Sequence, residues 1–313
     1  MRRLVLIALA ALILPSVALA AGPSYVAQGG LGILAHGGKN RFVAVPAGGR
    51  TAIVRIAVRG GAVDGWATLR GGWGIPQPTL SSVHLEGLTR DGKRLIVGTI
   101  AFNPPTRFAV IDTKTLRVRD RFALDGRFAY DTLSPDGKTL YLIQYVDADN
   151  ISRYVVRAYD LEDHVLLPGR IADKTQLGWV MEGFAVTRAT SDDGRWVYTL
   201  FMRPGGYPFI HALDAVNGTA HCIGLPWHGS NQDALAAMRM TLVNGGTALA
   251  LHWKNGRPWL TVQNGTWRIT RARPGGFAWG WTIGGLGAVM LAVLGAAAVV
   301  RVRQARREAV PAL

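Results

Sequence analysis

The chain has 313 residues, of which 49% are hydrophobic, and its only cysteine is Cys222. One cysteine excludes an internal disulfide framework, so buried apolar surface alone must hold the fold together, and about 255 residues can do this as one core or as a ring of small ones. The formal net charge is +15, of which about +10 remains when both ends are set aside. Such a charge suits anionic lipids, wall polymers or nucleic acid. The middle of the chain has no basic run longer than two residues, which favours ordinary solubility and gives no indication of nucleic-acid binding.

The first predicted element is a secretory signal peptide over residues 1–20. Arg2-Arg3 precedes an apolar stretch over residues 4–14, and Ala18-Leu19-Ala20 offers a small-residue cleavage site. This is the three-part layout of an export signal. A membrane anchor is the alternative, but the apolar stretch is short for a helix that spans a bilayer. We therefore expect the chain to be exported.

A turn followed by a strand recurs five times within residues 21–270. In the clearest copy, residues 134–138, proline fixes the backbone before the bend, Asp-Gly tolerates positive φ, and an aromatic, β-branched strand follows. The turns are 45–57 residues apart, at Gly38, Gly92, Gly137, Gly194 and Gly246. Three units continue with a strand that ends in an aspartate before a second turn, at Asp112, Asp160 and Asp214.

Four short strands in each unit of about 50 residues are the pattern of a β-propeller, in which each sheet buries its faces against its neighbours. Residues 21–270 show no long amphipathic helical pattern, which argues against βαβ units. We therefore expect an all-β fold, a β-propeller of about five four-stranded blades, with six or seven blades as alternatives. The interval from Asp64 to Thr79 is long enough for a degenerate sixth unit, although a long loop is the simpler interpretation.

The C-terminal end predicts a membrane anchor. A linker over residues 271–277 leads to residues 278–300, which are 23 positions without a charge. A helix of that length crosses a hydrocarbon core of about 30 Å, and the arginine-rich tail, residues 301–313, marks the cytoplasmic side. We therefore expect one C-terminal transmembrane helix in a bacterial cell membrane, with the propeller outside the cytoplasm. A cleavable sorting signal has a similar layout, but its Leu-Pro-x-Thr-Gly motif is missing.

Residues 95–118 and 133–142 resemble the YVTN-type family of β-propeller repeats, and the Ser-Pro-Asp-Gly-Lys turn is similar to that of TolB-like and WD40-like propellers. The Tyr-Val-Thr-Asn phrase itself is absent. The resemblance covers the strand–turn–strand phrase, in three units well and in two poorly. It implies a propeller fold without a particular activity, since these families include surface-layer, binding and scaffold proteins and some related propellers are enzymes.

An acidic residue recurs before four of the turns, at Glu86, Asp131, Glu182 and Asp233. If all four lie on innermost strands, their carboxylates converge near one mouth of the central channel. Converging carboxylates can hold a hard cation such as calcium or act as an acid–base pair, and the Glu-Gly pairs are similar to the metal-binding start of lactonase-type propellers. The simpler alternative is pairing with arginines or capping of strand ends. The acid stands five residues before the turn in two units and eleven in the other two, which would place the four at different heights.

Other chemical signals are weak. His211, His221 and His228 fall within 18 residues without the spacing of a zinc site, and no nucleophile elbow or phosphate loop occurs. Some of the tryptophans could line a surface for carbohydrate or protein, although packing between blades is commoner. The sequence thus predicts a membrane-anchored module that binds an unidentified protein or cell-envelope ligand, with no catalytic residue and no cofactor assigned. The alternative is a propeller hydrolase of the lactonase or glycosidase kind that uses the four carboxylates with a divalent cation.

Overall fold

The computed structural model describes residues 26–80, 85–173, 175, 180–227, 229 and 231–271. The chain divides into two compact units, Met1–Thr270 and Arg271–Leu313, and nearly all described residues belong to the first. The predicted signal peptide, transmembrane helix and cytoplasmic tail lie outside them. No helix in the described part is long and apolar enough to cross a bilayer.

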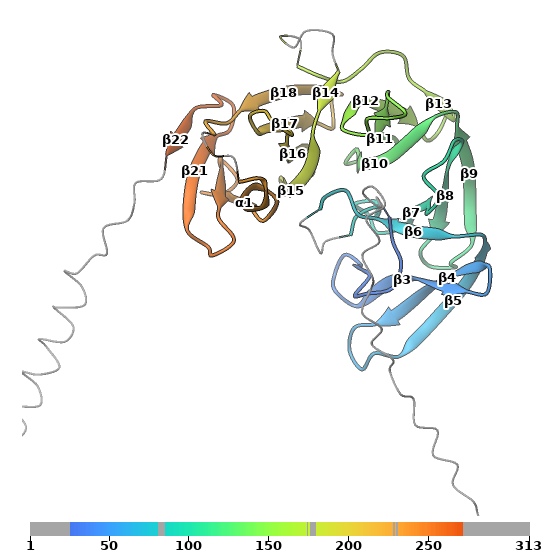
Figure 1. The fold of residues 1–313 in the computed structure, drawn as a ribbon. Helices are drawn as coiled ribbons and strands as arrows, with labels where there is room; N and C mark the ends of the chain where they lie inside the picture. Colours follow the sequence, from blue (N-terminus) through green and yellow to red (C-terminus); the bar gives the residue numbers. More distant parts are fainter. Residues whose placement is uncertain are drawn as a thin grey trace, which may run out of the picture. The chain divides into compact units, whose positions relative to one another are not determined.

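The first unit is built from five antiparallel sheets that follow one another in chain order (Figure 1). The first sheet contains β2 (Ile33–Leu34), β3 (Asn40–Ala47), β4 (Arg50–Ala57) and β5 (Val63–Arg70). The second contains β6 (Trp73–Pro76), β7 (Arg94–Thr99), β8 (Thr106–Asp112) and β9 (Val118–Leu124), with β1 (Val26–Ala27) beside β6. The third contains β10 (Arg127–Leu133), β11 (Thr139–Tyr145), β12 (Arg153–Asp160) and β13 (Val165–Leu166), with β14 (Met181–Glu182) beside β12.

The fourth and fifth sheets complete the described fold. The fourth contains β15 (Phe184–Thr190), β16 (Trp196–Met202), β17 (Phe209–Asp214) and β18 (Thr219–Gly224). The fifth contains β19 (Arg239–Val243), β20 (Ala248–His252), β21 (Pro258–Gln263) and β22 (Ile269–Arg271), and the short helix α1 (Gln232–Ala236) precedes it. Sheets of four strands that follow one another in chain order are the arrangement of a β-propeller, so this part of the prediction is confirmed.

The repeated turn forms as its residues predict. In the third sheet Gly137 adopts a φ of 70° and its N–H donates to the Ser134 carbonyl, while the Thr139 carbonyl accepts from the Ser134 N–H. The Asp136 carboxylate accepts from the Ser134 hydroxyl at 2.5 Å and from the Lys138 N–H at 3.0 Å. The turns at Asp91 and Asp193 repeat the contacts of this carboxylate. The aspartate thus satisfies donors that the bend leaves without a backbone partner.

The aspartate at the end of the third strand has a similar role. Asp112 accepts from the Thr115 N–H at 2.8 Å and from its hydroxyl at 2.9 Å. These bonds lower the pKa of Asp112 to about 2. Asp160 and Asp214 each accept from the two N–H groups that follow in their turns. A side chain that closes its own turn explains why this position recurs in three units.

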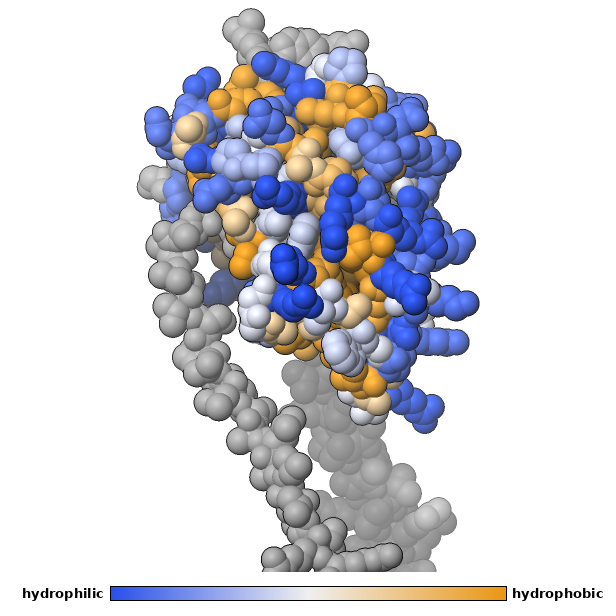
Figure 2. Space-filling model, turned by 90° about the vertical axis from the view of Figure 1, so that its right-hand side faces the viewer, coloured by the Kyte–Doolittle hydropathy of each residue, from blue (hydrophilic) through white to orange (hydrophobic). Residues whose placement is uncertain are grey.

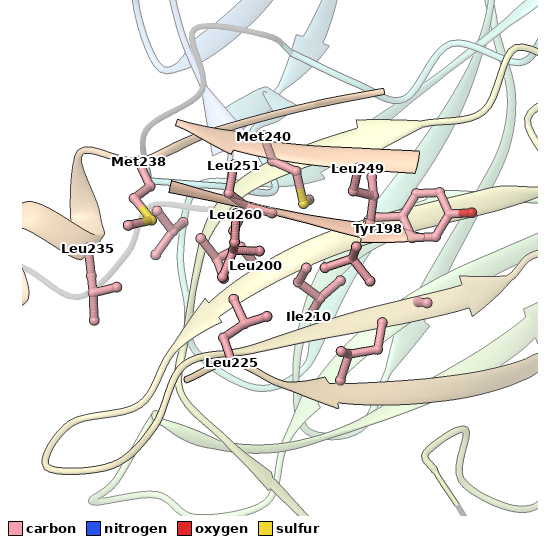
Figure 3. Close-up of a cluster of buried hydrophobic side chains, with 14 of the residues drawn as sticks. Tyr198, Leu200, Ile210, Leu225, Leu235, Met238, Met240, Leu249, Leu251 and Leu260 are labelled. Carbon is pink, nitrogen blue, oxygen red and sulfur yellow. The ribbon is translucent and has the colours of Figure 1, made fainter. Parts of the chain in front are cut away.

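The core lies between neighbouring sheets, because alternate residues of each strand face opposite sheets. Between the fourth and fifth sheets, Leu200 and Ile210 pack against Leu249, Leu251 and Leu260 (Figure 3). Similar clusters join the first sheet to the second, the second to the third and the third to the fourth. No sheet has a core of its own, so each depends on its neighbour for stability.

The outermost strands face solvent on one side. Strand β9 alternates exposed and partly buried residues, with Arg119 and Arg121 on its exposed side. On the face of the molecule drawn in Figure 2, hydrophilic residues lie among smaller hydrophobic areas. This alternation is expected of an antiparallel sheet that has one solvent-exposed face.

The interval from Asp64 to Thr79 is neither a long loop nor a sixth unit. Residues 63–70 form β5, the outer strand of the first sheet, and residues 73–76 form β6, which pairs with β7 of the second. The prediction of a loop was wrong, because Trp66 lies on β5 and Trp73 lies on β6. Trp66 is 67% exposed on β5, whereas Trp73 is buried in the core between the first two sheets.

Candidate ligand-binding site

The repeated turns of four sheets surround one cavity of about 620 Å³, here called the channel-mouth cavity. Its walls come from residues 31–41 of the first sheet, residues 85–90 before β7, residues 130–135 at the end of β10, and residues 190–194 at the end of β15. Each segment is the part of its unit that leads into the repeated turn. The repeat therefore builds the cavity, one wall from each unit.

The walls of the channel-mouth cavity are largely apolar. Ile33 and Leu34 contribute from the first sheet, Leu85 and Leu88 from the second, and Leu133 from the third. Leu34 is 53% exposed. A concave, mostly apolar site with a few polar groups is the common form of a ligand-binding pocket.

Like the exposed Asp192, Arg90 is a charged group of the rim without a side-chain partner in the described part of the chain. It is exposed, and its guanidinium makes neither an ion pair nor a hydrogen bond there. The hydroxyl of Ser191 and the N–H of Arg195 lower the pKa of Asp193, and the charge of Arg90 adds to this. Arg41, another cation of the rim, donates instead to the Leu31 carbonyl at 3.0 Å.

A buried charge cluster lies beside the cavity. Arg188 on β15 donates to the carboxylate of Glu86 at 3.1 Å and to both the carboxylate and the backbone carbonyl of Asp131. The side chains of Arg188 and Asp131 are each only 5% exposed, and that of Glu86 is 26% exposed. One cation thus joins the second, third and fourth sheets.

The backbone explains how Asp131 reaches this position. The pairing of β10 with β11 shifts register between Tyr130 and Thr132, so Asp131 is the extra residue of a β-bulge. Bulges commonly redirect a side chain out of the regular alternation of a strand. Here the redirected carboxylate meets the arginine of the next sheet.

Burial and charge act against each other in this cluster. Burial lowers the pKa of Arg188, but the charges of Glu86 and Asp131 outweigh it, so the pKa is raised above its ordinary value. Burial and the Glu86 charge raise the pKa of Tyr130 well above its usual range. Arg188 therefore stays charged and Tyr130 stays neutral at any physiological pH.

A polar row continues from this cluster across the fourth sheet. Arg188, Thr199, His211 and Cys222 stand opposite one another on the four adjacent strands. The Arg188 Nε donates to the Thr199 hydroxyl at 3.0 Å, and the His211 Nδ1 lies 3.6 Å from the Cys222 sulfur. Burial lowers the pKa of His211 to about 4 and raises that of the Cys222 thiol to about 11. Both groups are therefore neutral at pH 7.

The row ends at the outer edge of the sheet. The Asp173 carboxylate accepts from the Cys222 N–H at 2.9 Å and lies 2.9 Å from His221 Nδ1. The His221 ring stacks on Trp267 of the fifth sheet, with ring centroids 5.0 Å apart. These contacts tie the third, fourth and fifth sheets together.

The structure brings together two of the four predicted carboxylates. Glu86 and Asp131 share Arg188, whereas Glu182 on β14 pairs with Arg203 at 3.1 Å. Asp233 lies on α1 rather than on an innermost strand. In the described residues no group of three or more His, Cys, Asp and Glu is placed to hold a metal ion. His84 and His228 lie outside those residues.

Neither Arg188 nor Arg90 belongs to a recognisable sequence motif. Arg188 comes from the fourth unit, whereas its partners come from the second and third, so no local pattern links them. Arg90 stands just before the turn aspartate Asp91 and reads as an ordinary surface residue.

No family model and no curated protein sequence matches the chain. Among solved structures it is similar to hydrazine synthase of Kuenenia stuttgartiensis, with a TM-score of 0.50, 14% identity, and coverage of 83% of this chain and 69% of that one. It is also similar to TolB of Acinetobacter baumannii, with a TM-score of 0.42 and 15% identity, and the match covers 74% of this chain and 53% of that one. The β-propeller domain of Cps50 (Swd1) of Myceliophteria thermophila is similar with a TM-score of 0.44 and 9% identity, and the match covers 81% of this chain and 70% of that one. At such identities the likeness concerns the fold alone.

Proposed function

We propose that the chain is an extracytoplasmic β-propeller, anchored in a bacterial cell membrane by residues 278–300, that binds a segment of a partner protein at the channel-mouth cavity. The observation that carries this proposal is the convergence of four repeated turns on one apolar cavity with an unpaired arginine at its rim. The export signal and the anchor are proposed from the sequence.

The cavity favours a particular chemistry in its partner. Leucines from the second and third sheets and the exposed Leu34 of the first offer contact to an aliphatic or aromatic side chain. Arg90 offers a charge-assisted hydrogen bond to a carboxylate. We therefore expect the bound segment to carry an apolar anchor beside an acidic residue or a free C-terminus.

The buried cluster supports this proposal as a rigid support for the site. Arg188 fixes Glu86 and Asp131 in place through two ion pairs. A site whose surrounding side chains are already fixed loses little conformational entropy when a ligand binds. The alternative of a propeller hydrolase uses the four repeated carboxylates, Glu86, Asp131, Glu182 and Asp233. It stays a prediction, because no contact in the described residues favours it over binding.

Site-specific photo-crosslinking tests the proposal in cells that produce the full chain. A photoreactive residue at Leu34 is expected to give a discrete crosslinked product, and one at Val165, which is 46% exposed on β13, is expected to give none. Arg90→Glu in the Leu34 background should reduce the product, because it reverses the charge at the rim. Arg121→Glu on β9 is the charge-matched control and should leave the product unchanged. Equal products at both positions, or a product insensitive to Arg90→Glu, would contradict the proposal.

A further inference from the structure

A second cavity, of about 770 Å³, lies between α1 and the hairpin that joins β20 to β21. Asp233, Ala234 and Ala237 line one side, and Trp253, Lys254, Asn255 and Arg257 line the other. Its residues are distinct from those of the channel-mouth cavity, and none of them takes part in the Arg188 cluster. We call it the tryptophan cavity.

The indole that lines this cavity is held rigidly. Trp253 packs against Trp227 and Trp259, with ring centroids 5.8 and 5.6 Å away, and these two rings meet edge to face at 5.7 Å. The hairpin fixes the backbone of Trp253 as well, since its N–H donates to the Arg257 carbonyl and its carbonyl accepts from the Gly256 N–H. A ring held on two sides and at its backbone is a preorganised binding platform.

The polar groups around this platform are available to a ligand. The side chains of Asp233, Lys254 and Arg257 make no hydrogen bond or ion pair within the described residues. Asn255 uses its carbonyl oxygen to accept from the Arg257 N–H at 3.0 Å, which leaves its amide N–H₂ group. The cavity therefore combines one carboxylate acceptor with ammonium, guanidinium and amide donors around an aromatic face.

We propose that the tryptophan cavity binds a saccharide. A pyranose ring has an apolar face of C–H groups that stacks on an indole, and a rim of hydroxyls, each of which both donates and accepts hydrogen bonds. Asp233 can accept from such hydroxyls, while Asn255 and Arg257 can donate to them. The volume of the cavity lies within the range of small-molecule sites, about 300–1,000 Å³.

The charges of the cavity argue against other ligands that stack on tryptophan. Quaternary ammonium groups also bind aromatic rings, but Lys254 and Arg257 outnumber Asp233 and would repel a cation. An aromatic peptide side chain would desolvate these polar groups without giving them partners. The excess of positive charge instead favours a sugar that carries a carboxylate.

Titration of the full chain in detergent, followed by calorimetry and tryptophan fluorescence, tests the proposal with digalacturonate and cellobiose as probes. We expect saturable binding of at least one disaccharide, tighter for digalacturonate and weakened by salt. Trp253→Ala should abolish it, whereas Trp66→Ala, which removes an exposed indole from β5, should leave it unchanged. Asp233→Asn should weaken binding of the neutral cellobiose at least about fivefold, because it removes a charged acceptor for a sugar hydroxyl.

The test has results that overturn the proposal. Binding of choline or of a tryptophan dipeptide in place of both disaccharides would assign the cavity to another ligand class. Disaccharide binding that survives both Trp253→Ala and Asp233→Asn would place the sugar elsewhere. Asp233 is exposed on a short helix, so its variant keeps the test valid if Trp253→Ala fails to fold. No binding of either disaccharide at about 10 mM, a concentration at which even a site of millimolar affinity is filled, would also overturn it.

Discussion

Arg188 and Asp131 meet across the boundary between the fourth and third sheets, and the guanidinium donates both to the carboxylate of Asp131 and to its backbone carbonyl. The contact depends on the bulge that turns Asp131 out of the regular alternation of β10. Because Arg188 also holds Glu86 of the second sheet, it fixes the spacing of three units around the channel mouth.

Removing Arg188 should destabilise the protein strongly. Arg188→Met leaves the 5%-exposed Asp131 carboxylate without its cation, and breaking one side of a buried ion pair costs about 3–5 kcal/mol. Urea unfolding of the full chain measures this. Asp131→Asn introduced into Arg188→Met should recover part of the loss, because it removes the orphaned charge. A double variant no more stable than Arg188→Met would contradict the pairing.

His211 should make the protein less stable in weak acid. The unfolded chain protonates this histidine as the pH falls below 6.5, whereas the folded protein does so only near pH 4. The unfolded state therefore binds more protons between these values, so stability falls as the pH falls through this window, by about 2 kcal/mol between pH 7 and pH 5. His211→Gln should flatten this dependence in urea unfolding. His36→Gln changes an exposed histidine and should retain it. An unchanged slope in His211→Gln would contradict the assignment.

Calcium should not stabilise the protein. The guanidinium of Arg188 already contacts both carboxylates that the structure brings together, Glu86 and Asp131, and occupies the place where a cation would have to bind. We expect no change in the melting temperature at about 5 mM calcium, a level that fills even weak extracytoplasmic sites. A rise that Asp131→Asn abolishes would show that calcium binds there.

The repeated turn should contribute measurably to stability. Asp136→Ala removes the acceptor for the Ser134 hydroxyl and the Lys138 N–H, and each such bond is worth about 1 kcal/mol. We expect a loss of about 1–2 kcal/mol in urea unfolding. Asp125→Ala, at an exposed aspartate for which no such turn contact is seen, should have little effect. Equal losses in the two variants would contradict the role of the turn.

The sequence predicted the turns and the sheets because their chemistry is local. Asp136 meets its partners within two residues of itself, and Asp112 finds its partners within the following turn. The local pattern did not predict the two strands in residues 63–76, because tryptophans and glycines interrupt the alternation that is typical of a strand. There the pairing with β4 and β7, which lie elsewhere in the chain, decides the structure.

The candidate site was harder to predict, since it depends on contacts between units. Glu86 and Asp131 could be singled out as repeated acids, but the cation between them comes from the fourth sheet. Glu182 and Asp233 belong to the same repeated acidic motif but lie at different places in their sheets. The acid stands eleven residues before the turn in their units and five residues before it in the other two. The extra residues place Glu182 on β14 and Asp233 on α1.

The proposed function depends most on which side of the membrane the propeller occupies. Labelling of introduced cysteines with a membrane-impermeant maleimide in intact spheroplasts measures this directly. The native Cys222 gives a low background, because burial raises its pKa to about 11. Val165→Cys places a thiol at a position that is 46% exposed on β13, and Arg306→Cys places one in the C-terminal tail. We predict that Val165→Cys is labelled in intact spheroplasts and Arg306→Cys only after permeabilisation. Labelling of Val165→Cys only after permeabilisation would contradict the account.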